Sequence, residues 1–371
     1  MRKTVIIIPA LSPDRRLLDL IIELQSESFD KIIVIDDGSG IRYQNIFEQA
    51  KTLGCILVTH DKNYGKGAAL KSGIQESVKA YGRGHGIITV DADGQHKVSD
   101  ILKVADAMDK NPGKLILGTR DFSGENVPKR SRFGNRITSG IFGLVSGKKC
   151  PDTQTGLRGI PDELIILALT EEGRRYEYEM NFLSDAAEKT DLVFVPIETV
   201  YENNNETSHF RPVRDSLLIY GRFVRFLLSS VSGSIIDYFV FAFALILIPL
   251  LGGIYGTGLI VFATVTARLA SGTVNFIMNK VFAFQSRGNT FAEGVRYLIL
   301  FMVQMALSAG GVSILSMVIP VIWAKVVVDT TLFFISFVVQ KRWVFRKKSV
   351  ESKRLLEKTG IESYGKGALY E

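Results

Sequence analysis

The feature that most constrains this chain is a series of four long apolar segments in its C-terminal half. They cover residues 226–251, 255–278, 297–318 and 321–339. Each is close to the roughly 20 residues that a helix needs to cross about 30 Å of hydrocarbon. Four buried soluble helices of this length would need a far larger polar shell. We therefore predict an all-α, four-helix transmembrane domain over residues 226–348, after a soluble domain over residues 1–213.

Basic residues flank these segments on one side of the predicted membrane. Arg222 and Arg225 precede the first segment, and Lys280 and Arg287 follow the second. The third and fourth segments are flanked in the same way by Arg296, Lys341, Arg342, Arg346, Lys347 and Lys348. The opposite loops are short and nearly uncharged. The positive-inside rule then predicts that both termini and the soluble domain face the cytoplasm. The net charge of +7 could suggest a nucleic-acid partner, but the basic residues crowd the ends of the apolar segments, as in a membrane protein. We therefore expect no nucleic-acid partner.

The membrane half contains an internal repeat. The segment NKVFAF at 279–284 resembles QKRWVF at 340–345, an offset of 61 residues. This pattern predicts two helical hairpins of the same orientation. At the same offset Arg268 matches Asp329. Because charges inside a membrane are costly and usually paired, we predict that Arg268 faces Asp329, with Asp237 as a competing partner.

Two remaining segments and the two cysteines complete the predicted domain organisation. We expect residues 214–225 to form an interfacial helix between the domains. The tail over residues 349–371 is polar and mixed in charge, and we place it in the cytoplasm without a function. Cys55 and Cys150 are far apart and have no C-x-x-C spacing, which favours neither a disulfide framework nor a zinc site.

The soluble half alternates short β-branched runs with helical patterns. The predicted strands cover residues 5–8, 31–35, 56–59, 86–90 and 115–118. Helical periodicity lies between them, as at residues 16–25 and 68–79. Strands that are apolar on both faces and alternate with helices predict a mostly parallel α/β sheet covered on both sides. Ligands of such sheets bind beyond the carboxyl ends of the strands.

Acidic residues stand at two of these strand ends. One predicted strand runs into residues 36–37, both aspartates, and another runs into Asp91, Asp93 and Gln95. Oxygen ligands at alternate positions can converge on a hard cation, Mg²⁺ or Mn²⁺. Alternatively, each carboxylate caps a helix or makes a turn. One D-x-D triplet is weak evidence for a metal site, because it is frequent by chance. Two acidic strand ends with NYGKGAAL at 63–70 between them are a more specific signal.

Over residues 4–211 the sequence resembles the family-2 glycosyltransferases with the GT-A fold, and within them the polyprenyl- and dolichyl-phosphate sugar synthases. The motifs are IIIPAL, IVIDDGS, NYGKGAAL, VDADGQH, LGTRDF, SRFGN, DTQTGLRG and YEN…SHF. The resemblance implies a Rossmann-like catalytic domain. It also implies metal-dependent transfer of a hexose from a nucleotide-sugar to a polyprenyl phosphate, giving a lipid-linked sugar for glycan or polysaccharide assembly.

The resemblance also implies roles for individual residues. The nucleotide base and ribose would contact Pro9, Ile35 and Asp37. The metal and diphosphate would be held by Asp91, Asp93 and Gln95, with the Ala92 backbone close by. The acceptor phosphate would be gripped by Arg120 and Arg132, which with Asp93 form the expected catalytic set. Asp152 and Arg158 match a further D…R motif of undefined role.

The chain departs from the family pattern at positions that bind the nucleotide-sugar donor in family members. Family members often have an aromatic and an acidic residue where this chain has Leu11 and Pro13. The arginine and Ser-Lys pair that clamp the donor phosphates in the mannose enzymes correspond here to Asn203 and residues 208–209. We expect His209 and Arg211 to substitute for them. The altered clamp slightly favours a UDP-hexose over GDP-mannose.

The expected chemistry needs little from a general base. A phosphate monoester has a second pKa near ~6 and is largely anionic at neutral pH. The site must instead hold two anionic substrates in line, and the planar donor fork of arginine suits that task. A single in-line displacement would invert the anomeric configuration.

Residues 222–347 resemble the GtrA family of small four-span proteins associated with polyprenyl-linked sugars. The motifs are RFLLSSVSG, ARLASGTVNFIMNKVFAF and QKRWVF. The domain combination resembles the four-span dolichyl-phosphate mannose synthases. Two alternatives stay open: a lipid-sugar flippase with a donor-sensing domain, and a processive polysaccharide synthase. The second is the weaker, because residues 340–343 only superficially match its Q-x-x-R-W motif. The oligomeric state stays undefined.

Overall fold

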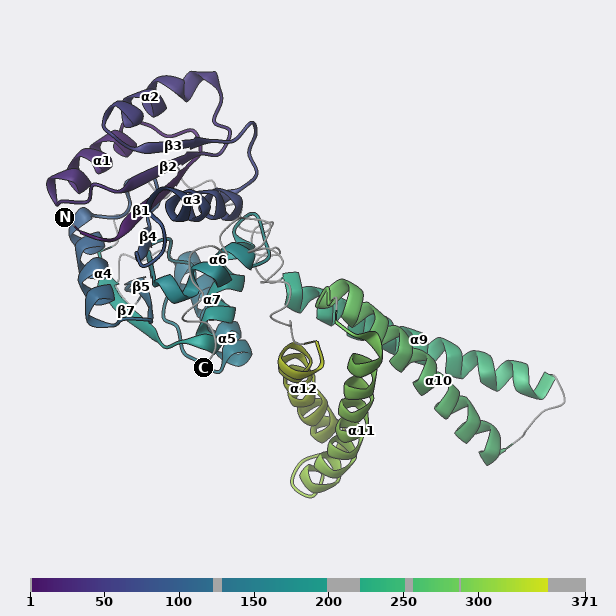
Figure 1. The fold of residues 1–371 in the computed structure, drawn as a ribbon. Coiled ribbons are helices and arrows are strands. Elements are labelled where there is room, and N and C mark those ends of the chain that lie inside the picture. Colours follow the sequence, from purple (N-terminus) through teal and green to yellow (C-terminus); the bar gives the residue numbers. More distant parts are fainter. Residues whose placement is uncertain (1, 123–128, 199–220, 251–255, 287, 346–371) are drawn as a thin grey trace. The chain divides into compact units, whose positions relative to one another are not determined.

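A computed structural model describes most of the 371-residue chain. The described residues are 2–122, 129–198, 221–250, 256–286 and 288–345. They fall into two compact units, the first ending at residue 198 and the second beginning at residue 221. Figure 1 shows an α/β unit and an all-helical unit, as the hydropathy pattern predicts.

A seven-stranded sheet forms the centre of the first unit. Its strands are β1 (Val5–Ala10), β2 (Ile32–Asp36), β3 (Ile56–Thr59), β4 (Ile87–Thr89), β5 (Leu115–Arg120), β6 (Arg158–Ile160) and β7 (Leu192–Ile197). Their spatial order is β3-β2-β1-β4-β6-β5-β7. Only β6 runs antiparallel to its neighbours, β4 and β5. The predicted mostly parallel α/β fold is confirmed.

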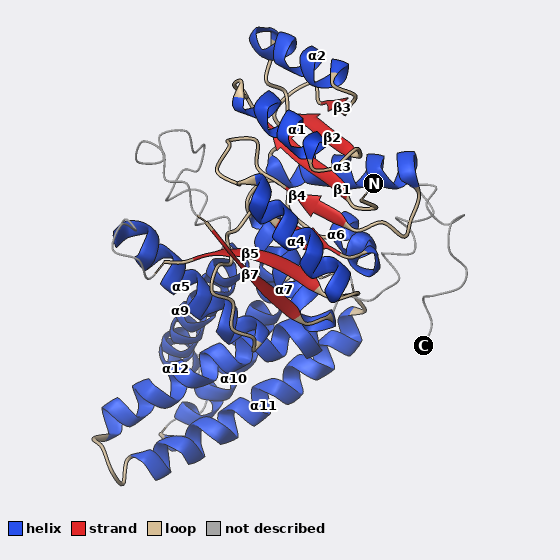
Figure 2. Cartoon of the chain, turned by 90° about the vertical axis from the view of Figure 1, so that its left-hand side faces the viewer, coloured by secondary structure: helices blue, strands red, loops and turns tan. Residues whose placement is uncertain are grey.

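Helices cover both faces of the sheet, as Figure 2 shows. One face packs against α1 (Arg16–Ser26), α2 (Gln44–Thr52) and α4 (Val98–Lys110). The other packs against α3 (Lys66–Tyr81), α5 (Lys129–Ser146), α6 (Ile165–Thr170) and α7 (Glu177–Lys189). Short 3₁₀ turns occupy Ile41–Tyr43 and Asp162–Leu164. Successive residues of β1 point to opposite faces of the sheet. Ile6 and Ile8 therefore pack in the first core, and Val5 and Ile7 pack in the second.

The sequence pattern missed two strands. The five predicted strands are present, with ends that differ by at most two residues. β6 has only three residues, one of them Arg158, whose side chain is 2% exposed. Such a short strand with a charged residue gives no periodic signal. β7 lies at the edge of the sheet, where Pro196 removes a backbone donor without breaking a central ladder.

The second unit consists of four helices that are long and apolar enough to cross a membrane: Phe223–Leu250, Gly258–Ala283, Thr290–Leu315 and Val321–Val344. They belong to α9 (Gly221–Leu250), α10 (Thr257–Met278), α11 (Thr290–Leu315) and α12 (Val321–Val339). α10 and α12 each continue into a π-helical turn, η4 (Asn279–Ala283) and η5 (Gln340–Val344). The prediction of an integral membrane protein with four spans is confirmed. α9 packs against α10, and α11 against α12.

Two helix boundaries differ from the predictions. α11 begins at Thr290 rather than near 297, because the Asn289 side chain caps it by accepting a hydrogen bond from the Ala292 backbone at 3.0 Å. The predicted interfacial helix over 214–225 lies mostly outside the described residues. Its last part, residues 221–225, is the start of α9.

The internal repeat is visible in the structure. The π-helical turns η4 and η5 occupy equivalent positions of the two hairpins, 61 residues apart. The buried Asn279 amide donates to the Gln340 side-chain oxygen at 3.0 Å, which joins the two hairpins. Phe284 and Phe345, also equivalent, stack with ring centroids 5.0 Å apart.

The predicted ion pair between Arg268 and Asp329 is not formed, although both side chains line the same cavity. Arg268 Nε lies 3.7 Å from Asp237 Oδ1, the competing partner, on the adjacent helix of the same hairpin. Asp329 instead accepts hydrogen bonds from Ser308 and from Lys325, both at 2.7 Å. Lys325 stands one turn away on α12, so Asp329 finds a cation within its own helix.

Candidate functional site

The predicted donor residues lie at neighbouring strand ends of the first unit. Pro9 of β1 and Ile35 of β2 are direct partners in the parallel ladder. Asp91 and Asp93 follow β4, which pairs with β1 on its other side. The sheet therefore brings together the residues expected to contact the nucleotide and the diphosphate.

Asp91 is the centre of a charged cluster. The Lys66 ammonium, at the first residue of α3, lies 2.7 Å from Asp91 Oδ1. The same ammonium lies 3.2 Å from Glu179 Oε1 on α7, a charge contact rather than a well-aligned hydrogen bond. His96 Nε2 lies 3.6 Å from the other Asp91 oxygen. A Cβ at Gly156 would come within 2.1 Å of Asp91 Oδ2, so a glycine is required there.

The cluster separates the acidities of its two aspartates. Burial by itself would raise the pKa of Asp91, but Lys66 and His96 outweigh it and hold that pKa well below the ordinary value. Burial by itself would lower the pKa of Lys66, but the charges of Asp91 and Glu179 outweigh it and raise that pKa. The amine therefore stays charged. Burial and the nearby Asp91 charge raise the pKa of Asp93. Asp91 and Asp93 thus share one site, in which the neighbouring positive charges favour the ionised form of Asp91 while Asp93 becomes harder to ionise.

The residues at the end of β4 fit a hard divalent cation. Two carboxylates and the Gln95 amide lie in one turn, where the Gln95 backbone N–H donates to Asp93 Oδ1 at 3.1 Å. Oxygen donors of this kind suit Mg²⁺ or Mn²⁺. Within the described part of the chain no group of three His, Cys, Asp or Glu side chains could hold a metal. A cation here would therefore complete its coordination with the amide, water or substrate oxygens.

Asp37 organises the loop before α3. Its carboxylate accepts hydrogen bonds from the Gly65 and Tyr64 backbone N–H groups at 2.7 and 3.0 Å. It also lies 2.7 Å from His60 Nδ1, whose Nε2 is 2.9 Å from the Ser72 hydroxyl. Asp37 is 4% exposed. Asp37 thus anchors the segment that carries Lys66.

Arg120 lies at the end of β5 and is oriented by a buried carboxylate. Arg120 Nε is 2.7 Å from Asp152 Oδ2, and Nη2 is 3.1 Å from Oδ1. Asp152 is fully buried, and Arg120 also lies over the Phe122 ring at 5.2 Å. The bidentate pair fixes the plane of the guanidinium. The aspartate of the D…R motif therefore positions Arg120.

The other predicted arginines have different surroundings. Arg132 lies on α5 and is exposed. Arg158 is buried and donates to the carbonyl oxygens of Thr155 and Glu179 at 2.9 and 2.7 Å, which ties β6 to α7. His209 and Arg211 lie outside the described residues.

The sequence reasoning missed three residues of the Asp91 cluster. Lys66 stands inside NYGKGAAL and His96 follows Gln95, so adjacency to a motif could have indicated both. Glu179 gave no such signal, because only the packing of α7 against α3 brings it to Lys66.

The parallel sheet with acidic strand ends, in a chain with four membrane spans, defines a membrane-attached α/β domain of the GT-A class. Residues 6–165 match Glycosyl transferase family 2, and residues 225–345 match the GtrA/DPMS transmembrane domain. The chain belongs to glycosyltransferase family 2 and is a glycosyltransferase.

Three relatives are each similar to part of this chain. A UDP-N-acetylglucosamine–dolichyl-phosphate N-acetylglucosaminyltransferase of Methanococcus voltae is 30% identical over 53% of this chain and 85% of the relative. Glycosyltransferase AglJ of Haloferax volcanii is 25% identical over 58% of this chain and 69% of its own length. A dolichyl-phosphate beta-glucosyltransferase of Dictyostelium discoideum is 31% identical over 41% of this chain and 52% of the relative.

Proposed function

We propose that this protein transfers a sugar from a nucleotide-sugar to a polyprenyl phosphate of the dolichyl type. The observation that carries the proposal is the Asp91–Lys66–Glu179 cluster at the end of β4, beside the β1 and β2 ends. Two of the relatives described above are named for transfer to dolichyl phosphate. In this proposal residues 1–213 catalyse the reaction, and residues 226–348 anchor the enzyme and receive the lipid.

Asp91, Asp93 and Gln95 would hold Mg²⁺ or Mn²⁺. The bound cation would neutralise negative charge that builds on the departing nucleoside diphosphate. Lys66 holds Asp91 ionised and fixed, because its ammonium contacts both Asp91 and the buried Glu179. Pro9 and Ile35 would form the floor on which the nucleotide base lies.

Arg120 would bind the acceptor phosphate in line with the anomeric carbon. Asp152 holds the guanidinium plane through two hydrogen bonds, so Arg120 is oriented before the substrate arrives. Arg132 would add a second positive charge from α5, and His209 with Arg211 would contact the donor phosphates. The phosphate attacks the anomeric carbon as the nucleoside diphosphate leaves, and the configuration inverts.

A UDP-linked hexose or N-acetylhexosamine is the proposed donor. The altered phosphate clamp disfavours GDP-mannose, and the Methanococcus voltae relative is named for UDP-N-acetylglucosamine. The test is to incubate membranes with dolichyl phosphate, Mn²⁺ and radiolabelled UDP-N-acetylglucosamine, UDP-glucose or GDP-mannose, and to measure organic-soluble label. Label is expected from a UDP-sugar and is expected to disappear in Asp93→Ala and with EDTA. Full activity of Asp93→Ala would reject the metal site.

We propose that the catalytic domain faces the cytoplasm. The basic residues at the helix ends near Arg225, Lys280 and Arg296 support this orientation. In sealed inside-out vesicles, protease is expected to remove the catalytic domain without detergent. Protection in inside-out vesicles and cleavage in right-side-out vesicles would reverse the assignment.

A further inference from the structure

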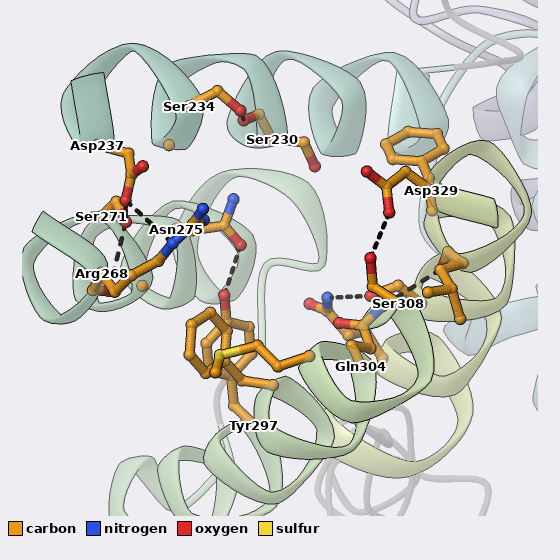
Figure 3. Close-up of a pocket in the computed structure, with 18 of the residues that line it drawn as sticks. Ser230, Ser234, Asp237, Arg268, Ser271, Asn275, Tyr297, Gln304, Ser308 and Asp329 are labelled. Atoms are coloured by element: carbon orange, nitrogen blue, oxygen red, sulfur yellow. Dashed lines mark hydrogen bonds and ion pairs between the residues drawn. The ribbon is translucent and has the colours of Figure 1, made fainter. Parts of the chain in front are cut away.

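A cavity of about 610 Å³ with both polar and apolar lining residues lies in the second unit, lined by all four of its long helices. Figure 3 shows polar side chains from the two hairpins around it. Asp237, Arg268 and Ser271 come from the first hairpin, and Gln304, Ser308 and Asp329 from the second. The volume lies within the roughly 300–1,000 Å³ of small-molecule sites.

The depth of these groups calls for a polar occupant. Arg268 lies near the middle of α10, and Asp329 near the middle of α12. Charged and polar groups in the hydrocarbon region are costly unless they face one another, water or a ligand. Lipid chains alone therefore do not suit this cavity.

The charges of the cavity cancel, which argues against a simple ion. Asp237 faces Arg268 at 3.7 Å, and Asp329 faces Lys325 at 2.7 Å. A free anion would need a net positive lining, and a free cation a net negative one. An uncharged ligand with many donors and acceptors matches a lining whose own charges are balanced.

The two hairpins present these groups at equivalent positions. Arg268 and Asp329 are 61 residues apart, the offset of the repeat. Asp237 and Ser308 are 71 residues apart, the offset that separates the aligned Arg225 and Arg296 at the starts of α9 and α11. Asp237 contacts Arg268 in one hairpin, and Ser308 contacts Asp329 in the other. Each hairpin thus contributes one polar contact, and the two flank the cavity.

The cavity also offers unused hydrogen-bonding capacity and flat apolar faces. The Arg268 guanidinium has five N–H donors, and its closest approach to the Asp237 carboxylate is 3.7 Å, longer than a hydrogen bond. Gln304 gives one amide hydrogen to the Leu332 carbonyl at 3.3 Å, and no donor to its own oxygen is found in the described part of the chain. Phe226 and Phe301 line the same space. Aromatic faces beside polar groups suit the C–H and O–H surfaces of a pyranose ring.

We propose that this cavity binds the sugar headgroup of the lipid-linked product, with Arg268, Gln304 and Asp329 as its hydrogen-bonding contacts. The inference rests on the proposed function, because that function supplies a membrane lipid with a polyhydroxylated headgroup. The lipid chain would lie between the hairpins in the hydrocarbon, and the sugar would replace water in the polar space.

The two native cysteines make a direct test possible. Both are buried in the first unit, and burial raises the pKa of Cys55 to about 11 and that of Cys150 to about 12. A cysteine introduced into the second unit is therefore the reactive thiol. Ser234→Cys places it in the cavity, and Ser232→Cys is the matched control on α9, because Ser232 is not part of the lining.

The probes are short-chain citronellyl phospho-glucose and phospho-N-acetylglucosamine, with citronellyl phosphate and free glucose as comparisons. Lipid nanodiscs are used because maltoside detergents carry a sugar headgroup. A water-soluble maleimide is expected to react with Ser234→Cys and much more slowly with Ser232→Cys. A sugar-phospholipid at about four times its Kd is expected to slow the Ser234→Cys reaction about fivefold. Adding Gln304→Leu is expected to weaken that protection about three- to tenfold in Kd.

Four results would overturn the inference. If citronellyl phosphate slowed the Ser234→Cys reaction as much as the sugar-phospholipids, the cavity would be a phosphate site. If free glucose alone slowed it, the cavity would bind a soluble sugar. Absence of protection, or a Ser234→Cys thiol no more reactive than Ser232→Cys, would remove the site. Transferase activity is measured separately in the same nanodiscs. The synthetic lipids test the cavity directly, so a failed transfer assay rejects the proposed function without deciding the binding result.

Discussion

Lys66→Met should destabilise the catalytic domain far more than its position at a helix start suggests. The Lys66 side chain is 19% exposed, and its ammonium compensates Asp91 and Glu179, which are 28% and 10% exposed. Methionine has a similar length and no charge, so the substitution removes the positive charge that the two carboxylates share and leaves His96 beside Asp91. The matched control is Lys79→Met on the same helix, whose side chain is 76% exposed.

The magnitude follows from the burial of the cluster. Removing one partner of a buried ion pair costs about 3–5 kcal/mol. Because Asp91 keeps some solvent contact, we expect the lower end, about 3 kcal/mol at pH 7. With a urea slope of about 2 kcal/mol/M, the unfolding midpoint falls by about 1.5 M. Lys79→Met, which removes a surface pair, should change stability by less than about 0.5 kcal/mol.

The assay must report the first unit alone. Both tryptophans, Trp323 and Trp343, lie in the second unit, so tryptophan fluorescence is unsuitable. Pulse proteolysis of the full chain in urea, with detection of an N-terminal tag, measures the folded fraction of the catalytic domain. Mn²⁺ should restore part of the Lys66→Met loss, because a cation at Asp91 and Asp93 replaces the missing charge. Equal midpoints for Lys66→Met and Lys79→Met would refute the electrostatic reasoning.

The pH dependence has a defined sign. The lowered pKa of Asp91 contributes stability above its unfolded value near ~3.9, which is lost as the pH falls through the folded pKa. The raised pKa of Lys66 contributes stability below about 10.4, which is lost as the pH rises through the folded pKa. The wild-type contribution is therefore constant between about pH 5 and 9. The Lys66→Met deficit should shrink on acidification, because protonated Asp91 no longer needs a partner.

Three further outcomes are expected. Gly156→Ala should lower kcat/KM about 100-fold in a folded protein, since its Cβ would displace Asp91, whereas Gly140→Ala, which has open space, should not. Asn279→Ala should destabilise the membrane unit by about 0.6–2 kcal/mol in tryptophan-monitored thermal unfolding, because the Gln340 side-chain oxygen loses the Asn279 donor; an unchanged Tm contradicts that role. The two native cysteines should resist a thiol reagent at pH 8 and react after denaturation; rapid native labelling would contradict their burial.

Local patterns alone identified the two-part architecture. Four spans follow from hydropathy and length, and the parallel sheet follows from strands that are apolar on both faces. Asp91 and Asp93 could be placed at a strand end because that placement depends only on where a short apolar run stops. The repeat over 279–284 and 340–345 was likewise visible in the sequence, and the structure gives it two equivalent π-helical turns.

Tertiary packing decided which charged groups meet. Glu179 reaches Lys66 across more than 100 positions of sequence, and Asp152 reaches Arg120 across 32. No periodicity encodes such contacts, because they depend on how helices and strand ends pack. Symmetry of the repeat suggested that Arg268 would face Asp329, yet Arg268 contacts Asp237. Equivalence in a repeat fixes the depth of two residues in the membrane, while the rotation and pairing of the helices decide what each side chain touches.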